Sequence, residues 1–176
     1  RIYWRRGQDI FLLKRDDPSF FRNLHITNKM GFETNVSYTS DLGITGFGVD
    51  ISRFFISSNN LGNRNRTMVN LFLEHRFKLG EFLDITPGVA ATYFSDFDFN
   101  AFPGVDVGVQ LSEKLKAYGN IGYTFRVPTF TDLYYRDPAT SGNPNLEPES
   151  AFAQELGVKF TDNNFSGSIS IFNRDS

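Results

Sequence analysis

The side chains that could do chemistry gather between residues 125 and 150. Guanidinium groups, phenols and a carboxylate stand close together there, in Arg126, Tyr134, Tyr135, Arg136 and Asp137. Aromatic faces and guanidinium groups suit a bulky, partly anionic ligand, which they hold by stacking and by charge-assisted hydrogen bonds. The alternative is a loop that packs its aromatic side chains onto its own protein. The residue types predict a ligand site here and leave both interpretations open.

Other candidates for catalysis or metal binding are weak. The histidines are His25 and His75, and neither has a neighbour in sequence that would make it a catalytic base. Asp96, Asp98 and Asn100 have the spacing of an oxygen-ligand cluster, but the glycine and distal glutamate of a calcium loop are missing. The sequence has no cysteine, no glycine-rich phosphate loop and no common hydrolase motif. We therefore expect no enzyme, no metal site and no cofactor.

The stretch from 127 to 150 is predicted to be a long loop. Proline fixes φ and donates no backbone hydrogen bond, so it interrupts a sheet. Glycine and asparagine before a proline mark a turn, as in Gly142-Asn143-Pro144. Long loops are uncommon in compact chains unless they are functional or disordered. The prolines of this loop are Pro128, Pro138, Pro144 and Pro148.

The rest of the chain alternates apolar and polar residues, which is typical of strands with one apolar face. After an uneven first strand within residues 2–15, the pattern predicts about nine antiparallel strands joined by hairpins. The apolar positions are Ile26, Met30, Phe32, Val36 and Tyr38; Phe47, Val49, Ile51 and Phe55; Val69, Leu71, Leu73 and Phe77; Leu83, Ile85, Val89, Ala91 and Tyr93; Val105, Val107, Val109 and Leu111; Leu115, Ala117, Ile121, Tyr123 and Phe125; Phe152, Leu156, Val158 and Phe160; and Ile169 and Ile171.

Connections alternate between short and long, so all short turns are expected on one rim and all long loops on the other. The long ones include residues 57–66 and 95–102 as well as the proline-rich loop. Strands of roughly ten residues at a tilt near 45° span about 23 Å, which matches the apolar band of an outer-membrane barrel. Aromatic residues near strand ends suggest interfacial girdles. These are Tyr38, Phe77, Phe160 and Phe165 on the short-turn side and Phe55, Tyr93, Tyr123 and Phe125 on the other.

A soluble β-sandwich or small barrel that binds lipid or carbohydrate would also alternate in this way. Against it, the polar face is rich in glycine, which would let something pack closely from inside a barrel. Arg53 lies in phase with the apolar face, where a charge at the bilayer midplane costs about 2–4 kcal/mol, so it must extend to a nearby rim, lie beyond a bulge or tell against a membrane. The glycines are Gly31, Gly46, Gly48, Gly88, Gly104, Gly108, Gly122 and Gly157.

Composition excludes some partners. The 176 residues carry a formal net charge of -2, and no basic cluster favours nucleic acid. No apolar run is long enough for a spanning helix and no leader opens the chain, whereas barrel strands remain compatible with a modest hydropathy.

One part of the chain resembles a known motif. Phe125-Arg126-Val127-Pro128-Thr129, then Leu133-Tyr134, then Gly142-Asn143-Pro144-Asn145-Leu146-Glu147-Pro148-Glu149, resembles the run FRxPT…LY…GNPxLKPE of TonB-dependent outer-membrane receptors. The similarity is greatest to vitamin B12 and siderophore receptors. Position 147 departs from the motif, with a glutamate where the family often has lysine.

The resemblance implies a barrel of about 22 strands with a plug in its lumen. Such receptors bind a scarce small molecule, such as a ferric siderophore or cobalamin, and import it with energy delivered by the TonB complex through the plug. We therefore expect residues 1–176 to be an internal to C-terminal part of an outer-membrane barrel, without a plug and with an extracellular loop at 127–150. A passive porin-like barrel is the second alternative.

Overall fold

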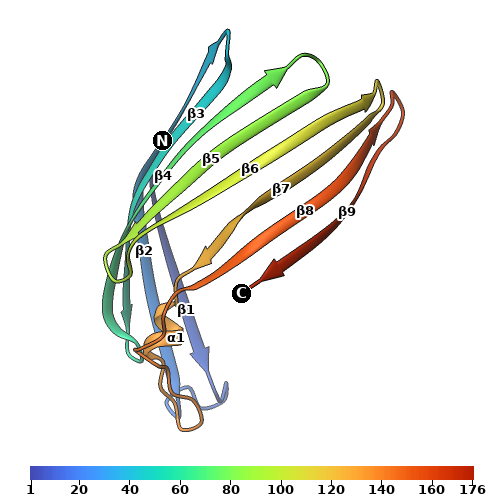
Figure 1. Ribbon diagram of the computed structural model, residues 1–176. Coiled ribbons are helices and arrows are strands. Elements are labelled where there is room, and N and C mark those ends of the chain that lie inside the picture. Colours follow the sequence, from blue (N-terminus) through green and yellow to red (C-terminus); the bar gives the residue numbers. More distant parts are fainter.

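The computed structural model describes residues 1–176 as one antiparallel sheet in which each strand pairs with the next along the chain (Figure 1). The strands are β1 (Ile2–Leu12), β2 (Arg22–Ser40), β3 (Gly43–Ser58), β4 (Gly62–Leu79), β5 (Leu83–Phe94), β6 (Asp98–Ser112), β7 (Leu115–Arg126), β8 (Glu149–Thr161) and β9 (Ser166–Asp175). One short helix, α1 (Phe130–Tyr134), interrupts the loop between β7 and β8. No helix of the structure is long and apolar enough to cross a membrane.

The turns at residues 41–42, 80–82, 113–114 and 162–165 lie at one end of the curved sheet, and α1 lies with the proline-rich loop at the other end, together with the turns at 59–61 and 95–97 (Figure 1). This confirms the predicted up-and-down order of nine strands. The sheet remains open, with β1 and β9 as its edges.

Strand lengths differ from the sequence-based expectation. The strands run from 10 residues in β9 to 19 in β2, rather than about ten throughout. The predicted loops at 57–66 and 95–102 shrink to residues 59–61 and 95–97, because β3, β4 and β6 continue through their polar ends. Polar residues on both faces look like a loop in sequence, yet the backbone ladder between β3 and β4 persists to Ser58 and Gly62.

The register places the alternating apolar residues on one continuous face. One row of this apolar face runs through Phe32, Ile51, Val69 and Tyr93 on β2 to β5. Large side chains on this face stay exposed, including Leu73 at 51%. Only 12 of the 176 residues are buried, so no second sheet covers the apolar face. The β-sandwich interpretation requires such a core and is wrong.

Arg53 and Phe125 each leave the apolar band. Arg53 lies beyond the row of Ile51, between Met30 and Thr67, where the apolar face turns polar. The next row toward the loop end, Arg6, Asn28, Phe55 and Asn65, is mostly polar, which agrees with the predicted position near a rim. The ring of Phe125 packs 4.9 Å from that of Phe102, which the register assigns to the polar face, so the prediction that Phe125 joins an aromatic girdle is wrong.

The glycines of the polar face make room for side chains of neighbouring strands. A Cβ on Gly31 would lie 2.6 Å from the ring of Tyr3 on β1, and one on Gly157 would lie 2.5 Å from the ring of Tyr118 on β7. Aromatic rings that lie flat over a cross-strand glycine recover packing that the glycine lacks. At Gly31 and Gly157 the close packing that was predicted thus comes from side chains of the sheet itself, whereas Gly104 and Gly122 meet only backbone atoms.

Candidate functional site

The proline-rich loop begins with a capped helical turn. The Thr129 hydroxyl accepts a hydrogen bond from the Asp132 amide at 3.1 Å, and the Asp132 carboxylate accepts one from the Thr129 amide at 2.8 Å. This reciprocal pair is a capping box, which satisfies amides that the first turn leaves without partners. The hydrogen bond from the Thr129 backbone lowers the pKa of Asp132. The sequence Val127-Pro128-Thr129 therefore ends β7 and starts α1.

Helix α1 is too short to be stable alone and is held by apolar contacts with the sheet. Phe130 packs with Ile56 of β3 and with Leu61 of the next turn, and all three are buried. Leu133 is 2% exposed. The loop thus folds back over the polar face of β3 and β4, onto the few apolar residues of that face.

Arg66 of β4 joins the proline-rich loop to the turn between β5 and β6. Its Nη2 donates to the carbonyl oxygen of Pro128 at 2.9 Å, and its Nε donates to the Asp96 carboxylate at 2.8 Å. The guanidinium carbon lies 4.9 Å from the ring centroid of Phe130 and 5.1 Å from that of Phe97. Only 12% of the Arg66 side chain is exposed, so these contacts are shielded from water. The arrangement also engages Asp96 as an ion-pair partner.

The two tyrosines of the predicted ligand set contact other parts of the protein. The Arg64 guanidinium carbon lies 3.8 Å from the centroid of the Tyr134 ring. The Asn23 amide, which is almost fully buried, donates to the Tyr135 hydroxyl at 3.4 Å. Both rings also pack against the buried cluster around Phe130. The structure therefore supports the packing role of these aromatic residues, and a ligand role stays a prediction.

The two arginines of that set present their side chains differently. Arg136 is exposed, while its backbone is fixed by Asn60, whose side chain donates to the Arg136 carbonyl at 2.6 Å and accepts from its amide at 3.1 Å. Arg126 is 65% exposed and lies 3.5 Å from Asp132 and 3.9 Å from Glu149. Arg126 is thus compensated by carboxylates, whereas the Arg136 guanidinium has no carboxylate within ion-pair distance.

Arg126 also lines a cleft of about 350 Å³ at the base of the loop. Its charged lining contains one cation and three carboxylates, so the cleft is acidic and disfavours an anionic ligand. Its residues are Arg126, Pro128, Asp132, Ser141, Asn143, Leu146, Glu147 and Glu149.

The tip and the return of the loop are held by local hydrogen bonds. The Asp137 carboxylate accepts from the amides of Ala139 and Thr140, and the first of these hydrogen bonds is the main cause of its lowered pKa. A Cβ on Gly142 would lie 2.8 Å from backbone atoms of Leu133. Only glycine allows this close approach of the returning chain to α1, which explains the glycine of the Gly142-Asn143-Pro144 turn.

Sequence reasoning missed the sheet residues that hold the loop. Asn60, Arg64 and Arg66 fall in a stretch that was expected to be a loop, and Asn23 lies before the first clear alternation. Arg64 and Arg66 continue the polar positions that alternate with Val69, Leu71 and Leu73. This alternation could have indicated that the strand begins before Val69. Their distance in sequence from the loop, up to 112 residues for the bond between Asn23 and Tyr135, left no local indication of the contacts.

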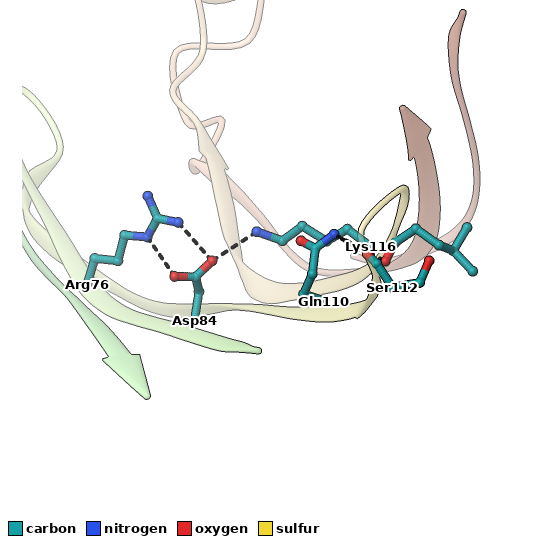
Figure 2. A network of polar contacts seen from close by, with 6 residues as sticks. Arg76, Asp84, Gln110, Ser112 and Lys116 are labelled. Carbon is teal, nitrogen blue, oxygen red and sulfur yellow. Dashed lines mark hydrogen bonds and ion pairs between the residues drawn. The ribbon is translucent and has the colours of Figure 1, made fainter. Parts of the chain in front are cut away.

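A second polar cluster lies on the polar face near the short turns (Figure 2). Asp84 of β5 accepts from Arg76 at 2.8 and 3.2 Å and from Lys116 at 2.9 Å. Lys116 lies on β7 and reaches across β6, where a Cβ on Gly108 would lie 2.6 Å from the lysine stem. Gln110 donates to the Ser112 carbonyl at 2.7 Å beside the irregular pairing at the end of β6. The glycine lets one carboxylate join β4, β5 and β7.

His75 lies near the same rim. Its Nδ1 is 2.8 Å from the Thr45 hydroxyl, its Nε2 is 3.3 Å from the Leu42 carbonyl oxygen, and its ring packs on Phe77. These contacts give His75 a structural role at the turn between β2 and β3.

Comparison with known proteins identifies the family. Residues 3–176 match the family described as TonB dependent receptor-like, beta-barrel. The chain belongs to this family. TonB-dependent receptors are receptors and transporters rather than enzymes, and the match extends far beyond the loop motif of residues 125–149.

Curated relatives share a short segment with the chain. The vitamin B12 transporter BtuB of Vibrio vulnificus is 38% identical over 53 residues, which are 30% of this chain and 8% of the transporter. BtuB of Photobacterium profundum is 43% identical over 51 residues, 29% of this chain and 8% of the transporter. The matched segment is thus a small part of each transporter.

Solved siderophore receptors share the fold of most or all of the sheet. The ferric enterobactin receptor PfeA of Pseudomonas aeruginosa superposes with a TM-score of 0.77 and 13% identity, covering 97% of this chain and 31% of the receptor. The siderophore receptor PirA of the same organism gives 0.69 and 19%, covering 87% of this chain and 31% of PirA. At these identities the likeness shows the fold, and the chain spans about a third of each receptor.

Proposed function

We propose that the chain forms part of the barrel wall of an outer-membrane receptor that binds a scarce small molecule and imports it with energy from TonB. The observation that carries the proposal is the family match over residues 3–176. In this proposal TonB acts through a plug domain outside residues 1–176. The uncovered apolar face of the sheet and the capped loop on its polar face support the same conclusion.

The apolar face would contact lipid and the polar face would line the lumen. Apolar side chains form continuous rows from β2 to β9 and remain exposed, which water disfavours and hydrocarbon does not. Charged residues such as Asp50, Glu74 and Asp84 belong to the polar face. The end that carries the loop at 127–150 would then be extracellular.

Spin labels test this orientation in the whole receptor in lipid. Labels at Val49, Leu71, Val107 and Ile121 should be accessible to oxygen, whereas labels at Asp50, Asn70, Asp106 and Asn120 should be accessible to a polar relaxation agent. The second set belongs to the polar face, which is proposed to line the lumen. If neither agent reaches the first set, the apolar face is covered by protein and the lipid-facing orientation is wrong.

Ligand recognition is proposed at the extracellular loop, mainly by Arg136 with Tyr134 and Tyr135, while Arg126, whose charge is already compensated by carboxylates, would be a secondary contact. Arg136 is the group best placed for a partly anionic ligand, because it is exposed, has no paired carboxylate and sits on a backbone anchored at both its amide and its carbonyl by Asn60. The names of relatives suggest the class of ligand: two are vitamin B12 transporters, and one solved PfeA contains enterobactin. A ferric siderophore or a cobalamin is therefore proposed.

Binding and uptake by the whole receptor test this function. A panel of ferric siderophores and cyanocobalamin should contain one ligand that binds tightly, and Arg136→Gln should weaken it about tenfold or more through loss of a charge-assisted hydrogen bond. Lys78→Gln, at the opposite end of β4, is the matched control and should leave the affinity unchanged. Uptake should stop in cells that lack TonB. Uptake that continues without TonB would instead favour a passive porin-like barrel.

A further inference from the structure

Three arginines face outward on the apolar side of β1 to β3, and two of them, Arg6 and Arg53, lie just beyond the apolar band, whereas Arg22 lies farther toward the loop end. The register aligns Trp4 of β1, Met30 and Arg53 across one row, and Arg6, Asn28, Phe55 and Asn65 across the next. We call Trp4, Arg6, Asn28, Arg53, Phe55 and Asn65 the rim patch. It combines two cations, two amides and two aromatic rings on one face.

The arginines of the rim patch lack acidic partners. Within residues 1–176, no carboxylate lies within 4.0 Å of Arg6 or Arg53, in contrast to Arg66 and Arg76 on the polar face, which are both paired. Arg53 instead donates to the Asn65 side-chain oxygen at 3.3 Å and lies 5.0 Å from the centroid of the Phe55 ring.

The surrounding face offers donors and no anions. From the row of Arg53 to the loop end, the residues that the register turns outward on β1 to β4 include no aspartate or glutamate. The nearby acids fall on the other face, as Asp9 of β1 and Asp50 of β3 show by their register. The outward residues are Trp4, Arg6, Gln8, Ile10 and Leu12; Arg22, Leu24, Ile26, Asn28 and Met30; Arg53, Phe55 and Ser57; and Asn63, Asn65 and Thr67.

An apolar hollow adjoins these cations. It measures about 740 Å³ and is lined by Ile2, Trp4, Met30, Phe32 and Ile51, with Arg53 and Thr67 among its polar members. Trp4 is 65% exposed beside it. An amphiphile fits such a surface, with hydrocarbon in the hollow and an anionic group at the arginines.

The spacing of the arginines suits phosphate. Arg6 and Arg53 flank β2 and are offset by two residues along it. Strand separation and rise then place their Cα atoms about 12 Å apart, so that both long side chains can converge on one headgroup. Guanidinium binds phosphate through two parallel hydrogen bonds, which amide donors such as Asn28 can supplement.

We propose that the rim patch binds the phosphate of an anionic lipid whose acyl chains lie in the hollow beside Trp4. The inference rests on one part of the proposed function, which is that the apolar face contacts lipid. It assigns the outward arginines a role separate from ligand uptake. Phosphate neutralises both cations where the wall passes from hydrocarbon to water.

Quenching of Trp4 fluorescence tests the proposal in the whole receptor in lipid nanodiscs. The discs contain a minor fraction of phosphatidic acid or of phosphatidylcholine, each with dibrominated acyl chains. Subtracting the emission of a Trp4→Phe variant isolates Trp4 from other tryptophans. We expect brominated phosphatidic acid to reach half-maximal quenching of Trp4 at a lower mole fraction than brominated phosphatidylcholine, by a factor of about five for each arginine that binds the phosphate.

Variants separate headgroup recognition from general lipid contact. In the double variant Arg6→Gln with Arg53→Gln, both lipids should quench Trp4 equally. The Arg5→Gln variant is the control, because the register turns the Arg5 side chain to the polar face, and it should keep the stronger quenching by phosphatidic acid. Higher ionic strength should weaken the preference.

Three outcomes would overturn the inference. Equal quenching by both lipids in the parent receptor would leave the lipid-facing orientation intact and remove the headgroup site. Absence of quenching by either lipid would remove both the site and the proposed orientation. Loss of the preference on addition of inorganic phosphate, but not of sodium chloride at the same ionic strength, would show a site for the free anion rather than for a lipid.

Discussion

Replacement of Arg66 by methionine should release the proline-rich loop from the sheet. The guanidinium is the one group that contacts the loop backbone at Pro128, the β5–β6 turn at Asp96 and the ring of Phe130 together. Methionine keeps much of the side-chain length and apolar volume, so the substitution removes mainly the charge and its hydrogen bonds.

The size of the effect follows from the shielding of these contacts. A hydrogen bond from a charged donor contributes about 1.5–3 kcal/mol, and a desolvated cation–π contact adds up to about 2 kcal/mol. The two share one side chain and are not additive, so we expect about 3 kcal/mol. We expect the docked loop to open separately from the strands, so that this loss should raise the opening equilibrium roughly 100-fold.

Amide hydrogen exchange on the whole receptor measures this equilibrium. The reporters are amides bonded within the loop: Leu133 to Thr129, Tyr135 to Thr131, Gly142 to Tyr135 and Asn143 to Asp132. Their exchange should accelerate by about two orders of magnitude in the Arg66→Met variant, while amides in the centre of the β3–β4 ladder should not change.

Arg126→Gln is the matched control for this prediction. Arg126 also contacts the loop, but at 3.5 and 3.9 Å and with 65% of its side chain exposed, so its ion pairs contribute at most about 1 kcal/mol. If the loop amides exchange alike in the Arg66→Met variant and the parent, the loop is not held by Arg66 and the account of its docking is wrong.

Three further predictions concern the loop and the polar face. Gly142→Ala should cost about 1–3 kcal/mol and speed exchange at Asn143, because the new Cβ would lie 2.8 Å from the backbone of α1. The pKa of Asp132 is lowered by the Thr129 amide, so the capping box stabilises the loop fully above the unfolded-state pKa of Asp132 and loses this stabilisation as pH falls through the folded-state pKa. Proteolysis of the loop should therefore increase as pH falls through the folded-state pKa, and the Asp132→Asn variant should not show this increase. Asp84→Asn should lower the stability of the receptor by about 1–3 kcal/mol, because it leaves Arg76 and Lys116 without their counter-charge. The measurement is the thermal midpoint of unfolding in detergent, which should fall.

Each of these three has a control within the chain. Gly122→Ala places its Cβ in ordinary contact, at 3.6 Å from the nearest atom, and should leave the loop unaffected. Asp41→Asn changes an exposed turn carboxylate and should leave the thermal midpoint unchanged. A pH response that survives in the Asp132→Asn variant would assign the acid sensitivity to another group.

The sequence alone determined the class of fold and the two faces of the sheet. A period of two is a local property of a strand, so positions such as Val49, Leu71 and Val107 could be assigned to one face before any pairing was known. Proline and glycine located the long loop for an equally local reason, since they act on φ and on backbone donors. The motif from Phe125 to Glu149 indicated the family.

Only the tertiary structure decided where strands end and what the loop contacts. Polar residues such as Arg64 and Arg66 remain in a strand because the neighbouring β3 supplies a hydrogen-bonding partner, which no window of sequence contains. The same distance in sequence hid the support of Tyr135 by Asn23 and the crossing of Lys116 over Gly108. Periodicity fixes which way a side chain points, whereas pairing between distant strands fixes what it meets.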